Sequence, residues 1–294
     1  MTAATMGPAV DHVTVAGEAL DRLERAFAEI GLAPVYGGAH STGGTQMALV
    51  GFDDGSYIEL IAAQTPGSAS GKWAAQIAGN GGPCAWCART SDIAAEAARV
   101  AALGVPVRGP VAMSRRRPDG TQVEWELLYP GDQEPGATLP FVIQDRTPRE
   151  LRVQPSPSVA DRELRGVAQV ILGVERIAPA VALFRRVYGL EAPEQREDAG
   201  FGARLARFVG TPVTLAEPLP GAAGDWLRER LAHFGPAPCA YLLASSDLDA
   251  SARRMGLTLA PEASGESGEW FGQRAAWVAP ERLGATRLGV VSAS

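Results

Sequence analysis

The feature that most constrains the fold of this chain is that its sequence repeats itself. The segment "PCAWCARTSDIAAEAARVAALGV" from residue 83 matches "PCAYLLASSDLDASARRMGLTL" from residue 238, and "AVDHVTVAGEALDRLERAFAEIGLAPV" from residue 9 matches "GVAQVILGVERIAPAVALFRRVYGLEAP" from residue 166. Each copy reads as an apolar strand followed by an amphipathic helix. Further segments of strand character, separated by Gly, Pro and Asp turns, follow each helix. The repeated unit is therefore βαβββ, and the sequence predicts four of them.

The positions of the repeats predict the domain boundaries. The modules cover about residues 8–66, 83–146, 165–220 and 237–292, and the polar, proline-containing segment "RTPRELRVQPSPSVADREL" lies between the second and the third. Such a composition is typical of a linker. We therefore predict an α+β chain with a first domain at 1–148, a linker at 149–164 and a second domain at 165–294.

Composition excludes several classes of partner. The chain has 294 residues, of which 46% are hydrophobic, and a formal net charge of −6. This charge does not favour nucleic-acid binding, which normally requires a basic surface. No stretch approaches the roughly 18 to 20 apolar residues that a membrane-spanning helix needs. We expect a soluble, cytoplasmic protein whose partner is a small molecule or another protein chain. Three cysteines are too few for a disulfide framework, and Cys84 and Cys87 are expected to be buried thiols.

Five short motifs in the first half carry a resemblance to a known superfamily. They are "DHVTV", "GGAHSTGGT", "YIELIAAQ", "RRRPDG" and "LPFVI". With the paired βαβββ modules, they resemble the vicinal oxygen chelate superfamily of glyoxalases, extradiol dioxygenases and bleomycin-binding proteins. Residues 9–146 are most similar to its glyoxalase-like domain family. The resemblance implies that paired modules curl into two open β-barrels with helices outside, that metal ligands come from the first and last strand of each module, and that a homodimer is common.

Because the modules repeat, the ligand position of one module can be assigned in the other three. The acidic residue that opens each helix lies six residues beyond the ligand position in the first strand. The positions so identified are His12, Trp86, Gln169 and Tyr241 in the first strands, and Glu59, Glu126, Thr214 and Leu288 in the last strands. Only the first half offers ligands, and His12, Glu59 and Glu126 would suit a divalent ion such as Zn, Mn, Ni or Fe. The same three residues are the candidate catalytic groups. Without a metal, His12 and Glu59 would form a buried structural pair, or a base with its orienting partner.

Alternation along "YIELIAA" predicts which side chains line the barrel. Tyr57, Glu59 and Ile61 share one face of the strand, and Ile58, Leu60 and Ala62 share the other. The first set is expected to face the interior and the second to pack under the helices. A carboxylate in such a place needs a partner, because burying an unpaired charge is costly.

Further residues are candidates for ligand binding. His40 is expected at the pocket mouth or in a loop hydrogen bond, and Trp86 on the pocket floor. In "SRRRPDG", which is first of all a turn signal, Arg115 or Arg117 is favoured over Arg116 for holding an anionic group.

Three functions remain open on the sequence alone. The leading hypothesis is a glyoxalase-like, metal-assisted lyase or isomerase that acts on a small oxygenated metabolite. The alternatives are a non-catalytic protein that sequesters a drug or aromatic compound, and a metal-free cyclase or isomerase that uses His12. A ring-cleaving dioxygenase ranks lower, because the first and last strands do not supply two His and one Glu. The second half is expected to support the first, to form a dimer surface, or to offer a second apolar pocket rimmed by Tyr241, Trp270 and Trp277.

Overall fold

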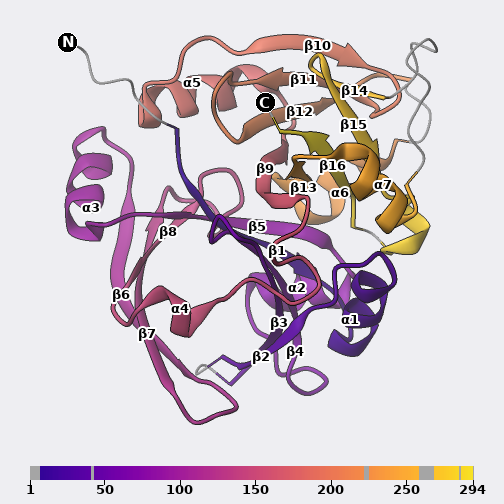
Figure 1. Ribbon diagram of the computed structural model, residues 1–294. Coiled ribbons are helices and arrows are strands. Elements are labelled where there is room, and N and C mark those ends of the chain that lie inside the picture. The colour runs from indigo at the N-terminus through magenta and orange to yellow at the C-terminus, as the bar shows by residue number, and fades with distance from the viewer. Residues whose placement is uncertain (1–6, 41–42, 222–224, 258–267, 285, 294) are drawn as a thin grey trace.

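Two curled eight-stranded sheets make up the protein in this computed structural model, in which residues 7–293 are described apart from 41–42, 222–224, 258–267 and 285. Figure 1 shows the first sheet in indigo to magenta and the second in salmon to yellow, with α1 (Leu20–Glu29), α3 (Ile93–Ala102), α5 (Ile177–Tyr188) and α7 (Leu248–Met255) on their outer sides. Four βαβββ modules in two pairs are therefore confirmed, as is the α+β class. No helix of the described residues is long and apolar enough to cross a membrane.

The first sheet is built around the antiparallel pair of β1 and β5, the first strands of the two modules. The last strand of each module, β4 or β8, runs parallel to the first strand of the same module. Across the sheet the strands are β2 (Val35–Ala39), β3 (Thr45–Gly51), β4 (Tyr57–Ala63), β1 (Val10–Ala16), β5 (Gly82–Arg89), β8 (Phe141–Asp145), β7 (Gln122–Pro130) and β6 (Val107–Arg116).

The second sheet repeats this arrangement. Its central strands β9 and β13 are antiparallel, and β12 and β16 run parallel to them. Across the sheet the strands are β10 (Glu194–Asp198), β11 (Ala203–Arg207), β12 (Val213–Pro218), β9 (Leu164–Gly173), β13 (Ala237–Ser245), β16 (Leu288–Ser292), β15 (Gln273–Trp277) and β14 (Glu269–Trp270).

Four helices begin where the repeated motifs predict, namely α1, α3, α5 and α7. The structure adds α2 (Lys72–Ala78), α4 (Arg149–Arg152), α6 (Trp226–Phe234) and a 3₁₀ turn at Pro280–Arg282. The repeated Ser-Asp pair supplies the N-caps of α3 and α7, because Asp92 accepts from the backbone N–H of Ala95 and Asp247 from that of Ala250, each at 2.9 Å.

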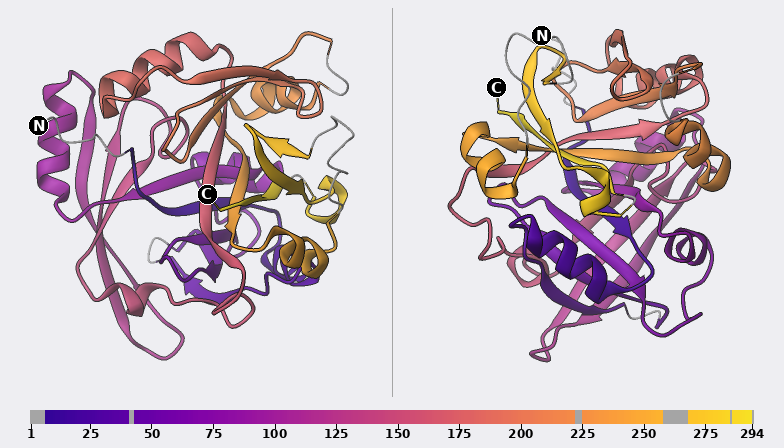
Figure 2. Two further views of the ribbon diagram at one scale, coloured as in Figure 1. Left: turned by 45° about the horizontal axis from the view of Figure 1, so that its top comes forward. Right: turned by 90° about the vertical axis from the view of Figure 1, so that its right-hand side faces the viewer.

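The two sheets pack against each other through their outer faces. Val13 and Trp86 of the first sheet share one apolar core with Val170 and Tyr241 of the second, and the ring of Phe184 on α5 stacks on Trp86 at 6.4 Å. Figure 2 shows β9 and β13 close to β1 and β5 in further views. The halves are thus joined by a continuous core, and the concave face of the first sheet stays open to a cavity.

Two residues of this core were expected in pockets. Trp86 is fully buried, and its Nε1 donates to the carbonyl oxygen of Thr138 at 3.1 Å. The prediction that Trp86 forms a pocket floor places it on the wrong face of the sheet. Asp92 is itself the N-cap of α3, whereas Glu18 stands one residue before the N-cap of α1. Six residues back from Glu18 and six back from Asp92 are therefore not equivalent positions of the two strands. They differ by one residue, and a shift of one residue exchanges the two faces of a strand.

Tyr241 shows the same offset, because Asp247 is the N-cap of α7. Its fully buried hydroxyl lies 2.9 Å from the carbonyl oxygen of Thr14 and 2.8 Å from that of Ala85. Tyr241 therefore connects the halves and does not rim a second pocket. Trp270 and Trp277 do border a smaller cavity of about 190 Å³ in the second half.

Candidate functional site

The concave face of the first sheet encloses a cavity of about 600 Å³. This volume is within the range of small-molecule sites. Its polar or charged lining includes His12, His40, Tyr57, Glu59, Arg108, Arg115 and Arg152, and its apolar wall includes Met47, Ile61, Met113, Trp125, Tyr129 and Phe141. The predicted alternation of β4 is confirmed, because Ile58, Leu60 and Ala62 lie on the opposite face in the core between the sheets.

His12 is held in place from one side by Asp11. Its Nδ1 lies 2.7 Å from the Asp11 carboxylate, and its ring stacks on Tyr57 at 4.6 Å and meets the edge of Phe141 at 5.3 Å. Because an ionised carboxylate only accepts hydrogen bonds, Nδ1 is the protonated nitrogen. Nε2 is then left as the basic nitrogen of a ring that lines the cavity.

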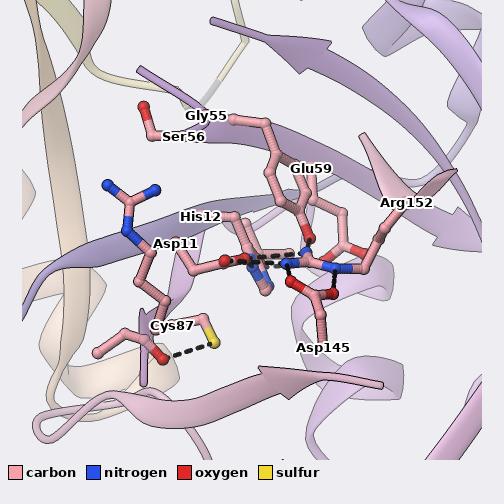
Figure 3. A network of polar contacts seen from close by, with 12 residues as sticks. Asp11, His12, Gly55, Ser56, Glu59, Cys87, Asp145 and Arg152 are labelled. Atoms are coloured by element: carbon pink, nitrogen blue, oxygen red, sulfur yellow. Dashed lines mark hydrogen bonds and ion pairs between the residues drawn. The ribbon is translucent and has the colours of Figure 1, made fainter. Parts of the chain in front are cut away.

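Asp11 is fully buried and bound by two arginines of α4. Arg152 donates to both of its oxygens at 3.0 and 2.9 Å, and Arg149 donates to one of them. Burial alone would raise the pKa of Asp11, but the charges and hydrogen bonds of Arg152 and His12 hold it well below its usual value. Figure 3 shows Arg152 bonded to both Asp11 and Asp145. The Asp11 carboxylate is therefore ionised, and it fixes the orientation of His12.

The arginines that bind Asp11 come from the segment expected to be a linker. Residues 149–156 pack against the first sheet: Ser156 Oγ accepts from the backbone N–H of Gly51 at 3.0 Å, and a Cβ on Gly51 would lie 2.1 Å from the carbonyl oxygen of Gln154. This close approach requires glycine at position 51. The segment therefore forms part of the wall of the site.

Glu59 is a second buried carboxylate in the cavity. Thr14 Oγ1 donates to one of its oxygens at 3.1 Å, and His40 Nε2 lies 3.4 Å from the other. Burial raises the pKa of Glu59, but contacts with His40, the charge of His12 and the Thr14 hydroxyl outweigh this and lower it to about 2. Glu59 is thus ionised, and two imidazoles are close to it. His40 is further held by a 2.8 Å contact between its Nδ1 and Thr45 Oγ1.

Arg115 also lines the cavity, as one of the two arginines favoured from the sequence. It donates to the carbonyl oxygens of Gly37 on β2 and Arg152 on α4, and thereby joins the two edge strands of the sheet, β2 and β6. Burial lowers its pKa. Arg117 does not border the cavity; it donates to the carbonyl oxygen of Leu151 at 3.0 Å.

Glu126 does not join His12 and Glu59. It stands on the outer face of β7, half-buried and paired with Arg146, whereas its neighbours Trp125 and Leu127 line the cavity. The last strand of the second module is β8 and not β7, so the prediction that Glu126 occupies a last strand is wrong. The residues of β8 that line the cavity are Phe141 and Ile143, and neither side chain offers a ligand.

Other side chains of the first half also group ligating atoms. In the described part of the chain, the ligating atoms of Asp11, His12 and Cys87 all lie within 4.8 Å of one another. This group fits a divalent ion poorly, because both Asp11 oxygens accept from guanidinium groups and a cation would be repelled by them. Burial also raises the pKa of the Cys87 thiol well above its usual value, whereas a thiol ligates as thiolate.

A second set has a more suitable chemistry. His12 and His40 each have Nδ1 in contact with a carboxylate or hydroxyl, and the Nε2 of His40 lies 3.4 Å from the ionised Glu59. Two imidazoles and one carboxylate are a common ligand set for divalent transition metals, and such histidines normally have their other nitrogen hydrogen-bonded. The sequence missed His40 in this set because it precedes β3 and lies in no first or last strand.

The corresponding site of the second half is not ionisable. Gln169 and Thr214 occupy the places of His12 and Glu59, and Thr214 Oγ1 donates to Gln169 Oε1 at 2.8 Å. Phe201, Trp226, Trp270 and Trp277 pack together inside this barrel. The predicted loss of ligands from the second half is thus visible as a neutral hydrogen-bonded pair beside an aromatic core.

The paired βαβββ modules and the cavity on the concave face define this chain as a member of the vicinal oxygen chelate superfamily. The glyoxalase-like domain family matches residues 10–188, which is more than half of the chain, so the protein belongs to this family. The match runs through residues 149–164 as far as the end of α5.

Solved structures agree in fold. A hypothetical protein from Staphylococcus aureus is 16% identical, with 97% of this chain and 99% of that chain covered and a TM-score of 0.62. A mutant of 4-hydroxymandelate synthase from Streptomyces coelicolor is 15% identical, with 97% and 92% covered and a TM-score of 0.61. At these identities the likeness concerns the fold alone. No curated protein matches the sequence.

Proposed function

We propose that the first half is a lyase or isomerase of the glyoxalase-like kind, in which His12 removes a proton from a small oxygenated metabolite bound in the cavity. The observation that supports this most is the buried contact between His12 Nδ1 and Asp11, 2.7 Å long, on a ring that lines the cavity. A base with one nitrogen fixed by a carboxylate and the other facing the substrate is an effective arrangement for general base catalysis.

The surrounding charges support this role. When His12 takes a proton, the new positive charge lies next to Asp11 and is attracted by Glu59, and both are ionised. With its pKa near 2, Glu59 is itself a weak base at neutral pH. Its role is therefore to stabilise the protonated imidazole and to position His40. The apolar wall keeps water away from the reacting atoms, which strengthens these electrostatic interactions.

The second candidate is the metal-assisted form of the same reaction class. His12, His40 and Glu59 would hold a divalent ion, which when bound supplies a Lewis acid that polarises substrate oxygens. The observation that favours it is a pair of imidazoles whose Nδ1 atoms contact Asp11 and Thr45, together with the 3.4 Å contact of His40 with Glu59. Sequestration of a hydrophobic compound is a weaker explanation, because an apolar cavity does not require two buried carboxylates and two histidines.

Hydrogen exchange tests the proposed chemistry without knowledge of the product. The protein is incubated in D₂O with a set of small hydroxyketones, 2-oxo acids and 2-hydroxy acids, and deuterium incorporation is followed by ¹H NMR. We expect exchange at the carbon next to an oxygenated carbon, lost in His12→Gln and retained in His233→Gln, an exposed histidine of the second half. The absence of exchange with every compound would contradict the proposal and favour sequestration.

Metal analysis separates the two enzyme candidates. Untagged protein purified without a chelator is analysed for its elemental content, together with three ligand variants, His12→Gln, His40→Gln and Glu59→Gln, and the control Glu126→Gln. Metal-free protein with full exchange activity supports His12 as the base. Near-stoichiometric metal that is lost in the three ligand variants and retained in the control would overturn that assignment and make His12 a ligand.

A further inference from the structure

The charged groups of the large cavity do not balance. Arg152 and Arg149 are paired with Asp11 and Asp145. The remaining cavity charges are the anion Glu59 and two cations, Arg108 and Arg115. Neither cation forms an ion pair with an acidic side chain among the described residues; Arg115 donates only to carbonyl oxygens, and Arg108 lies over the ring of Tyr129 at 4.7 Å. One positive charge is thus left in excess.

Arg108 and Arg115 lie near opposite ends of β6. They are seven residues apart, so the bulged strand separates their backbones by about 20 Å at a rise of about 3.3 Å per residue. Arg115 is buried and its charge interacts with that of Glu59, whereas Arg108 is exposed. The excess charge is therefore at the open end of the cavity, next to Val111, an apolar side chain that is 40% exposed.

A continuous row of rings leads from the base to this cation. The ring of Phe141 lies 5.3 Å from that of His12 and 6.2 Å from that of Tyr129, and the Arg108 guanidinium lies over Tyr129. A molecule with its reacting carbon at His12 and a planar or apolar body along these rings would bring its far end to Arg108. A guanidinium on an aromatic face is well placed to bind an anionic group as well.

We propose that Arg108 is a specificity-determining residue, and that the substrate is an anionic molecule with an apolar or aromatic body. Its anionic group binds the Arg108 guanidinium at the mouth, its body covers Tyr129, Phe141 and Val111, and its oxygenated carbon lies at His12. This inference rests on the proposed function only in taking this cavity as the substrate site. A divalent ion at Glu59 would make the cavity more positive and the preference for an anion stronger.

Two fluorescent probes that share one ring system test the proposal by binding alone. They are 8-anilinonaphthalene-1-sulfonate, which is anionic, and N-phenyl-1-naphthylamine, which is neutral. Loss of one charge-assisted contact is expected to weaken binding about ten-fold. We expect this loss for the sulfonate in Arg108→Gln and an unchanged affinity for the amine. Arg116→Gln, an exposed arginine of the same strand, is the matched control.

Each other result would overturn the proposal. Equal weakening of both probes in Arg108→Gln would assign Arg108 to the shape of the mouth and not to charge recognition. Loss of sulfonate binding in Arg287→Gln, at the small cavity of the second half, would place the probe there. Wild-type protein that binds neither probe would show that this cavity does not accept such a molecule. Probe binding is independent of proton exchange, so failure of the proposed reaction and failure of this inference are distinguishable.

Discussion

The hydroxyl of Tyr241, in the second half, lies 2.9 Å from the carbonyl oxygen of Thr14, in the first. Thr14 lies on β1, one of the two central strands of its sheet, and its side chain donates to Glu59 at 3.1 Å. The half without ionisable site residues therefore contacts the strand that positions the carboxylate of the other half. Its structural role extends to the cavity wall.

Replacing Tyr241 by Phe is expected to lower the free energy of unfolding by about 1 to 3 kcal/mol, because the carbonyl oxygens of Thr14 and Ala85 lose a buried donor. Urea unfolding monitored by circular dichroism measures the change. Tyr36→Phe is the control, since Tyr36 is 47% exposed and its hydroxyl is 3.5 Å from its partner. Equal stability of the two variants would show that the contact between the halves contributes nothing.

Trp86 and Trp125 offer a comparison between core and cavity. Trp86→Phe removes a hydrogen bond and volume from a fully buried site, and we expect a loss of about 1 to 3 kcal/mol in unfolding free energy with unchanged binding of N-phenyl-1-naphthylamine. Trp125→Phe, in the cavity wall, is expected to weaken binding of that probe with a smaller loss of stability. Weaker binding of the probe to Trp86→Phe, with unchanged binding to Trp125→Phe, would show that Trp86 and not Trp125 lines the cavity.

The fold was largely predictable from the sequence, because it depends on patterns that local physics enforces. The repeats predicted four modules, and alternation along β4 predicted that Tyr57, Glu59 and Ile61 face the interior. His12, Glu59, His40, Tyr57 and Arg115 do line the cavity. These positions follow from strand periodicity and from motifs whose register is fixed within a few residues.

The errors arose where the result depends on long-range contacts or on a single residue of register. Trp86 was misplaced because Asp92 is an N-cap and Glu18 is not. Glu126 was placed in a last strand because its segment resembles that of Glu59, although β8 takes that place. The sequence does not indicate the role of residues 149–152, because Arg149 and Arg152 pair with Asp11, which is far away in the sequence. Composition predicts a linker at 149–164, and it carries no signal for these ion pairs.

Asp11 is expected to be important for stability as well as for the orientation of His12. Asp11→Asn leaves two arginines without part of their buried counter-charge and should lower the unfolding free energy by about 3 kcal/mol. Asp21→Asn, which breaks an exposed pair with Arg25, should change it by less than about 0.5 kcal/mol. ¹⁵N NMR of the His12 ring should show protonated Nδ1 in the wild type and a mixture of tautomers in Asp11→Asn. An unchanged ring spectrum would contradict the orienting role.

Glu59 predicts a specific acid sensitivity. Its pKa is lowered in the folded protein from 4.5 to about 2, so the ionised form stabilises the fold fully above pH 4.5, and this stabilisation is lost as the pH falls from 4.5 towards 2. The unfolding free energy of the wild type minus that of Glu59→Gln should therefore decrease by about 2 kcal/mol between pH 6 and pH 3. Other acids titrate in both proteins and cancel in this difference. Glu18→Gln, at an exposed position, is the matched control. A constant difference for Glu59→Gln would mean that Glu59 is not held as a carboxylate by its neighbours, and would remove the counter-charge assigned to it beside His12.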